Sequence, residues 1–118
     1  MAKTILIVDD DPDILETARD ILQDAGYTVY AEGTGAGALT KLQSTQVDIA
    51  IFDFNLPDTK GIDLAVRAKQ IHPDIPIVLL TGEGTVDLGS AKDAIDIVLT
   101  KPVNPAQLIQ VIQAKVDS

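Results

Sequence analysis

The stretch TILIVDDDPDIL, residues 4–15, decides how the rest of the chain is interpreted. Four apolar residues, 5–8, run directly into Asp9, Asp10 and Asp11. A strand this apolar is typical of a parallel sheet that is covered on both faces. Two carboxylates about 4 Å apart repel each other by roughly 4 kcal/mol at an effective dielectric constant near 20. A nearby cation would offset this repulsion, and without one the side chains must spread into water.

The composition limits the class of protein. A chain of 118 residues, 46% of them hydrophobic, fits a single domain over residues 1–118 with an ordinary core. The absence of cysteine excludes disulfides and thiolate metal sites. A net charge of −9 argues against direct binding of nucleic acid. The sequence contains no signal-type segment and no apolar run long enough for a membrane, so we expect a cytoplasmic protein.

Five short apolar runs alternate with helical patterns along the chain. We expect strands at residues 4–8, 28–31, 47–52, 76–80 and 95–100, and helices from residue 12 to about 25, at 36–42, at 62–71 and at 105–116. This alternation predicts an α/β fold, a doubly wound five-stranded parallel sheet with helices on both faces. Residues 82–94 contain three glycines, which predicts a short, weak or partly unwound helix.

Charged and hydroxyl side chains stand where the expected strands end. Asp9 and Asp10 follow the first strand, Asp53 the third, Thr81 the fourth and Lys101 the fifth. Ligands of open parallel sheets bind beyond the carboxyl ends of the strands, so these five residues should meet there. One divalent cation and Lys101 would balance the charge of the three carboxylates. Mg²⁺ accepts such oxygen ligands, and a carboxylate held beside it can attack phosphorus to form an acyl phosphate.

Simpler explanations exist for each of these residues taken alone. Acidic residues after a strand commonly lie in a solvated turn at a helix start, which is our interpretation of Asp11 and Asp13. Asp53 alone could cap a turn, and Lys101 alone could be a surface lysine. The position of each residue directly at the end of a strand favours a shared site.

Four segments carry a resemblance to a known family: ILIVDDDPDIL, DIAIFDFNLPDTKGIDL, PIVLLTGEG and VLTKPVNPAQL. Together they resemble the receiver domains of bacterial two-component response regulators, whose flavodoxin-like sheet has the strand order 2-1-3-4-5. The resemblance implies that Asp53 is the phosphoryl acceptor and that Thr81 and Lys101 assist the transfer. It also implies that Asp9, Asp10, Asp53 and the backbone carbonyl of Asn55 hold Mg²⁺. A cis bond between Lys101 and Pro102 is implied as well.

The resemblance further implies partners and a switch. A histidine kinase or histidine phosphotransfer protein would donate the phosphoryl group, and phosphorylation would move Thr81 and signal to an unknown effector or output domain. Such a domain is no enzyme toward other substrates, since it catalyses only its own phosphorylation and slow dephosphorylation. The sequence leaves open whether the chain acts alone or as the amino-terminal module of a longer protein.

Two features concern the switch and its lifetime. Val98 occupies the position where relatives often carry an aromatic side chain on the fifth strand, so the usual aromatic readout is in doubt. Residues 81–101 also form a slightly shorter segment than is typical. Asn55 and Glu83 lie two residues beyond Asp53 and Thr81, and by orienting a water they would give a short-lived phosphoryl state.

Two other functions fit parts of the sequence. GTGAGA, residues 33–38, matches a dinucleotide-binding fingerprint with an acid, Asp53, twenty residues later, although it lies at the second strand of a short chain. An aspartate nucleophile with Mg²⁺ and a lysine also describes aspartate-dependent phosphohydrolases. Those enzymes need additional substrate-binding segments and a second aspartate, whereas this chain has Asn55 at the corresponding position.

Overall fold

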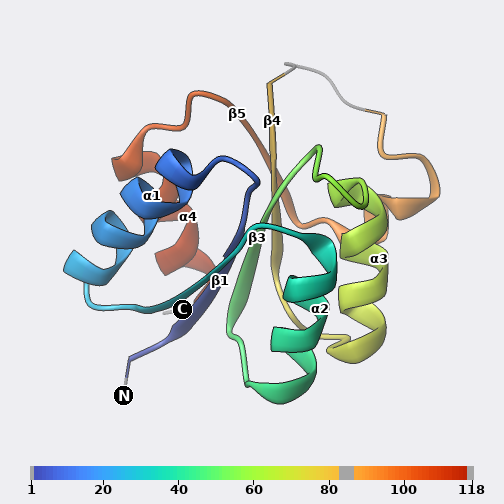
Figure 1. The fold of residues 1–118 in the computed structure, drawn as a ribbon, viewed down its shortest axis with the longest axis horizontal. Helices are drawn as coiled ribbons and strands as arrows, with labels where there is room; N and C mark the ends of the chain where they lie inside the picture. Colours follow the sequence, from blue (N-terminus) through green and yellow to red (C-terminus); the bar gives the residue numbers. More distant parts are fainter. Residues whose placement is uncertain (1, 83–86, 117–118) are drawn as a thin grey trace.

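Five parallel strands form the centre of the protein, with helices packed on both faces (Figure 1). The structure is a computed structural model that describes residues 2–82 and 87–116. The strands are β1 (Thr4–Val8), β2 (Thr28–Glu32), β3 (Ile49–Asp53), β4 (Ile77–Thr81) and β5 (Ile97–Thr100). The helices are α1 (Pro12–Asp24), α2 (Gly35–Ser44), α3 (Gly61–Ile71), the 3-10 helix η1 (Gly89–Ala94) and α4 (Pro105–Val116).

The strand order is β2-β1-β3-β4-β5, as the family resemblance implies. Helices α1 and α4 cover one face of the sheet, and α2 and α3 cover the other (Figure 1). Side chains along β1 alternate between the two faces: Ile5 and Ile7 belong to the core under α1 and α4, whereas Leu6 and Val8 belong to the opposite core. All four are at most 1% exposed, which explains why the strand is apolar without interruption.

Helix starts follow the chemistry of their first residues. The Asp11 carboxylate accepts a hydrogen bond from the backbone N–H of Asp13 and caps α1, whose first residue is Pro12. Thr34 caps α2 in the same way through the N–H of Gly37. The interpretation of Asp11 as a residue of the helix start is therefore confirmed.

The bounds of four strands differ by one or two residues from those expected from the sequence. β2 ends at Glu32 instead of residue 31, and β4 covers Ile77–Thr81 instead of residues 76–80. β3 begins at Ile49 instead of residue 47 and extends to Asp53. β5 begins at Ile97 instead of residue 95, because Ile95 closes η1 and Asp96 bonds to the start of β4. The Asp96 N–H donates to the Ile77 carbonyl at 2.9 Å, and the Asp96 carboxylate accepts from the Ile77 N–H at 2.7 Å.

The glycine-rich segment before β5 forms little regular structure in the residues that are described. Gly89 has a φ of +55°, a conformation that glycine adopts without strain, and it begins the six-residue helix η1. A 3-10 helix in place of an α-helix agrees with the short or weak helix that the three glycines predict. Glu83 lies outside the described residues. None of the helices within residues 2–82 and 87–116 has the length and apolar character that a membrane crossing requires.

Candidate functional site

The register of the sheet brings the ends of four strands to the same level. Val8 pairs with Phe52 across β1 and β3, and Asp53 pairs with Leu80 across β3 and β4. Neighbouring strands lie about 4.8 Å apart, so Asp9, which follows Val8, must lie beside Asp53. Ile5 and Ile7 in β1 face the same side as Ile49 and Ile51 in β3, and this alternation directs both aspartates to the side of α1 and α4.

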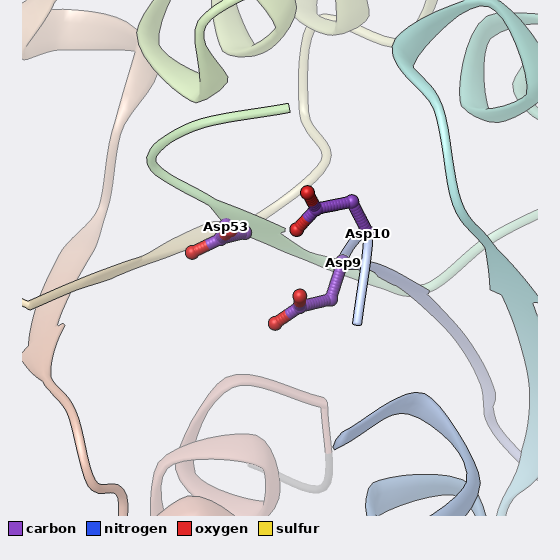
Figure 2. Close-up of side chains that lie close together, drawn as sticks. All are labelled: Asp9, Asp10 and Asp53. Atoms are coloured by element: carbon purple, nitrogen blue, oxygen red, sulfur yellow. The ribbon is translucent and has the colours of Figure 1, made fainter. Parts of the chain in front are cut away.

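Three carboxylates gather beyond the ends of β1 and β3. One oxygen from each of Asp9, Asp10 and Asp53 lies within 4.8 Å of the others, and Figure 2 shows the three side chains around a common space. Asp9 is 1% exposed and Asp53 8% exposed, whereas Asp10 is open to solvent. Three carboxylate oxygens with one open side fit a small hard cation that keeps some of its waters, as Mg²⁺ does.

Lys101 provides the positive charge beside this cluster. Its Nζ lies 2.7 Å from Asp53 Oδ1 and 3.2 Å from Asp9 Oδ2, so one ammonium bridges two carboxylates. Burial lowers the pKa of Lys101, but the hydrogen bond to Asp53 and the charges of Asp9 and Asp53 outweigh it, and the net pKa is raised. The ammonium form is therefore stabilised at this position.

The surroundings of Asp9 disfavour its ionised form. Burial raises its pKa above the ordinary value, and the nearby charge of Asp53 raises it further. Two contacts act in the opposite direction: the Asp11 N–H donates to Asp9 Oδ1 at 3.0 Å, and Lys101 pairs with Oδ2. Because the net pKa is raised, the ionised carboxylate of Asp9 costs free energy, and a bound cation would recover it.

Thr81 lies at the end of β4, the strand that pairs with β3 beside Asp53. It is 1% exposed, and its carbonyl accepts a hydrogen bond from the Lys101 N–H at 2.7 Å. This bond joins the end of β4 to the segment that carries Lys101. The bond between Lys101 and Pro102 is cis, as the family resemblance implies.

Asn55 lies on the loop between β3 and α3. Its side chain is exposed, and its Oδ1 accepts a hydrogen bond from Lys60 Nζ across the antiparallel bridge between these two residues. Asn55 is two residues beyond Asp53 in the chain, and the role of its backbone carbonyl as a metal ligand stays a prediction. Lys60, by contrast, gave no sign in the sequence that it contacts Asn55.

Gly61 is a residue of the site that the sequence reasoning missed. A Cβ at this position would overlap the backbone oxygen of Asp53, and the Gly61 N–H donates to the Phe54 carbonyl at 2.7 Å. Only glycine allows α3 to begin this close to the end of β3. The available signal was a glycine directly before an expected helix, a position where glycine is common and therefore indicates little.

Asp58 was also missed, and it bears on the dinucleotide alternative. Its carboxylate accepts hydrogen bonds from the N–H groups of Gly35 and Ala36, at 2.8 and 2.9 Å. These are the amides that a pyrophosphate would use at the start of α2. The glycines of residues 33–38 therefore serve close packing and helix capping within the protein.

Comparison with known proteins identifies the class to which this fold and site belong. Residues 5–113 match the response regulator receiver domain family, and the chain belongs to that family. The chain functions as a receiver domain of the two-component type. A structure of a CheY-like receiver domain from Methanospirillum hungatei superimposes with a TM-score of 0.93 at 34% identity, over 99% of this chain and 95% of the other.

Two curated relatives show how this domain is used in chains of different length. The DNA-binding response regulator MtrA of Mycolicibacterium smegmatis is 36% identical over 98% of this chain and 51% of its own. The receiver protein CpdR of Brucella abortus is 35% identical over 94% of both chains. The chain thus spans about half the length of the first of these relatives and nearly all of the second.

Proposed function

We propose that Asp53 accepts a phosphoryl group while Mg²⁺ is held by the carboxylates of Asp9, Asp10 and Asp53 and the backbone carbonyl of Asn55. One observation carries the proposal: the Asp53 carboxylate pairs with Lys101 and lies within 4.8 Å of two other carboxylates at the carboxyl edge of the sheet. The match to the receiver domain family over residues 5–113 spans all of these residues.

In the proposed reaction, a carboxylate oxygen of Asp53 attacks the phosphorus of a phosphohistidine. The new O–P bond forms as the N–P bond breaks, and the electron pair of that bond leaves with the donor imidazole. Lys101 Nζ, 2.7 Å from Asp53 Oδ1, orients the carboxylate before the reaction and pairs with the phosphoryl oxygens as they approach. The Thr81 hydroxyl contributes a hydrogen bond to the transferred group. Mg²⁺, when bound, neutralises negative charge on the attacking carboxylate and on the phosphoryl oxygens.

The proposed donor is a histidine kinase or a histidine phosphotransfer protein, and the downstream effector is unknown. MtrA is named as a DNA-binding regulator and is about twice as long as this chain, so an attached or separate output partner is consistent with the relatives. Direct binding of this domain to nucleic acid is not part of the proposal, since its net charge is −9. A cytoplasmic location stays an expectation.

The lifetime of the phosphoryl group is a separate proposal. Asn55 is exposed and tied to Lys60, next to the acceptor, where it can orient an attacking water. We expect a double variant, Asn55→Ala with Glu83→Ala, to lose phosphoryl groups more slowly than the parent. Equal rates of loss from purified phosphoprotein would reject a role for these two side chains.

The phosphoryl acceptor is tested by exposing the protein to acetyl phosphate with and without Mg²⁺. We expect the intact mass to increase by one phosphoryl group only when Mg²⁺ is present, and Asp53→Asn to remain unmodified under both conditions. Modification of Asp53→Asn to the extent of the parent would exclude Asp53 as the acceptor. Sustained hydrolysis of a generic aryl phosphate, at enzyme-like rates, would instead favour the phosphohydrolase alternative.

A further inference from the structure

The loop between β3 and α3 is fixed to a helix far from it in the sequence. Asp58 Oδ1 accepts a hydrogen bond from the Gly35 N–H at 2.8 Å, and Oδ2 accepts one from the Ala36 N–H at 2.9 Å. The bonds span 23 and 22 residues of chain. One carboxylate on the loop therefore binds both amides at the first two positions of α2.

Capping alone does not explain this contact, because α2 has its own cap. Thr34 immediately precedes the helix, and its Oγ1 accepts from the Gly37 N–H at 3.0 Å. Thr34 acts within the segment that forms the helix, whereas Asp58 joins that segment to another one. The approach is close, since a Cβ at Gly35 would overlap the Thr59 Cγ2 atom. The contact thus fixes where the loop lies as well as where α2 begins.

The same loop continues directly from the proposed phosphoryl acceptor. Asn55 and Lys60 form an antiparallel bridge, and the Leu56 N–H donates to the Thr59 carbonyl at 3.0 Å. These bonds close residues 54–61 into a small hairpin, with Asp58 near its tip. These bonds connect the position of Asp58 to that of Asn55 through the hairpin.

We propose that Asp58 is a positioning residue for the metal site, which fixes the β3–α3 loop against α2 so that the Asn55 carbonyl is in place when Mg²⁺ binds. The inference rests on the proposed function, since it assumes the magnesium site described above. Asp58 touches neither the acceptor nor the acidic cluster in the contacts of the structure, and it acts through the loop alone. The two backbone hydrogen bonds lower the pKa of Asp58, so its carboxylate is ionised at neutral pH and accepts both of them.

Two matched variants separate positioning from helix stability. Asp58→Ala and Thr34→Ala each remove a side-chain cap from the start of α2, but only Asp58→Ala releases the loop. We measure the dissociation constant for Mg²⁺ by calorimetry on the 118-residue chain, without a phosphodonor. Asp58→Ala is expected to bind Mg²⁺ about tenfold more weakly, the lower end of the range for residues that support metal ligands. Thr34→Ala is expected to match the parent, and Asp58→Asn, which keeps one acceptor oxygen, to lie between.

A second measurement needs no variant, and it applies even if Asp58→Ala does not fold. If Mg²⁺ and the Asp58 contact stabilise the same position of the loop, each must favour the other. Saturating Mg²⁺ should therefore slow hydrogen exchange of the Gly35 and Ala36 amides in the parent. The Gly37 amide, bonded to Thr34, serves as the internal reference and should change less.

The outcomes distinguish the two claims. If Asp58→Ala binds Mg²⁺ as tightly as the parent, the positioning role is overturned while the metal site stands. The same holds if Mg²⁺ does not change hydrogen exchange of the Gly35 and Ala36 amides in the parent. Equal weakening by Asp58→Ala and Thr34→Ala also overturns it, since helix stability would then explain the effect. A parent that binds no Mg²⁺ overturns the proposed metal site and this inference with it.

Discussion

Asp9 and Asp53 place two carboxylates where a sheet of aliphatic side chains ends. Asp9 is 1% exposed, and its pKa is raised because burial disfavours the ionised form. Lys101 offsets this only in part, since it is shared with Asp53. At the scale of single residues, the ionised form of Asp9 is therefore disfavoured in the folded protein without a metal ion.

Replacing the buried charge tests that statement. With a raised pKa in the folded state, Asp9 binds its proton more tightly than in the unfolded chain, so acidification through that pKa adds stability. Asparagine is neutral at every pH, so Asp9→Asn has this added stability throughout the pH range. We expect it to melt at a higher temperature than the parent at pH 7 without Mg²⁺, and the difference to shrink as the pH falls through the raised pKa.

The control for this experiment is Asp11→Asn. Asp11 is exposed and caps α1, and asparagine caps a helix about as well as aspartate. Its melting temperature should stay close to that of the parent. An Asp9→Asn protein less stable than the parent at pH 7 would mean that the ion pair with Lys101 outweighs the cost of burial.

Lys101→Met removes the cation and leaves its partners without a counterion. A buried acceptor that loses its donor costs about 1–3 kcal/mol, so the free energy of unfolding should fall by that amount without Mg²⁺. The matched control is Lys69→Met, which breaks the ion pair of Lys69 with the more exposed Asp96 and should cost less than about 1 kcal/mol. Urea denaturation of both variants makes the comparison. Equal losses would show that Lys101 is an ordinary surface partner.

At the scale of elements, the start of α3 is built around Asp53. Gly61→Ala would drive a Cβ into the Asp53 backbone oxygen, and overpacking of this kind typically costs about 1–3 kcal/mol. We expect this loss in urea denaturation, together with slower phosphorylation by acetyl phosphate, because the strain acts on the acceptor itself. Gly82→Ala is the control, since a Cβ there meets nothing within 4 Å. If Gly61→Ala matched Gly82→Ala, α3 would not constrain the acceptor.

Most of the strands and helices could be predicted from the sequence. Alternating apolar runs and helical patterns predicted all five strands, because each pattern is local, whereas the order of the strands was implied by the family resemblance. The glycines before β5 correctly indicated weak helical structure, which the structure shows as η1. The starts of β3 and β5 were wrong by two residues, at Ile49 and Ile97, because pairing between strands decides the boundary.

Some contacts of the candidate site could be predicted from the sequence, and others could not. Asp9, Asp53 and Lys101 could be predicted to meet, because a parallel sheet brings the ends of its strands to one edge. The contacts of Asp58 and Gly61 could not, since they depend on the path of one loop against segments up to 23 residues away. An aspartate in a turn and a glycine at a helix start also have common local explanations, so neither signalled a special role.

At the scale of the whole molecule, metal binding and stability are coupled. A ligand present at 100 times its dissociation constant stabilises the folded state by about 2.7 kcal/mol. Mg²⁺ should therefore raise the melting temperature of the parent, and Asp9→Asn should lose most of that increase because it lacks one carboxylate of the cluster. If Asp9→Asn showed the same increase in melting temperature as the parent, the cation would have to bind elsewhere.

Val98 affects how a change at the site reaches the surface. It is 38% exposed on β5, and valine has no long side chain to swing between an outward and an inward position. We therefore expect a signal from Asp53 to leave through another element, such as the β3–α3 loop, which Asp58 joins to α2.

Locating the phosphoryl group in the chain tests most directly whether Asp53 is the Mg²⁺-dependent acceptor. The protein is treated with acetyl phosphate and Mg²⁺, reduced with borohydride, which converts an aspartyl phosphate to homoserine, and mapped by peptide mass spectrometry. We expect homoserine at residue 53, and none when Mg²⁺ is chelated. Homoserine at residue 9 or 10, or the same yield at residue 53 without Mg²⁺, would contradict this expectation.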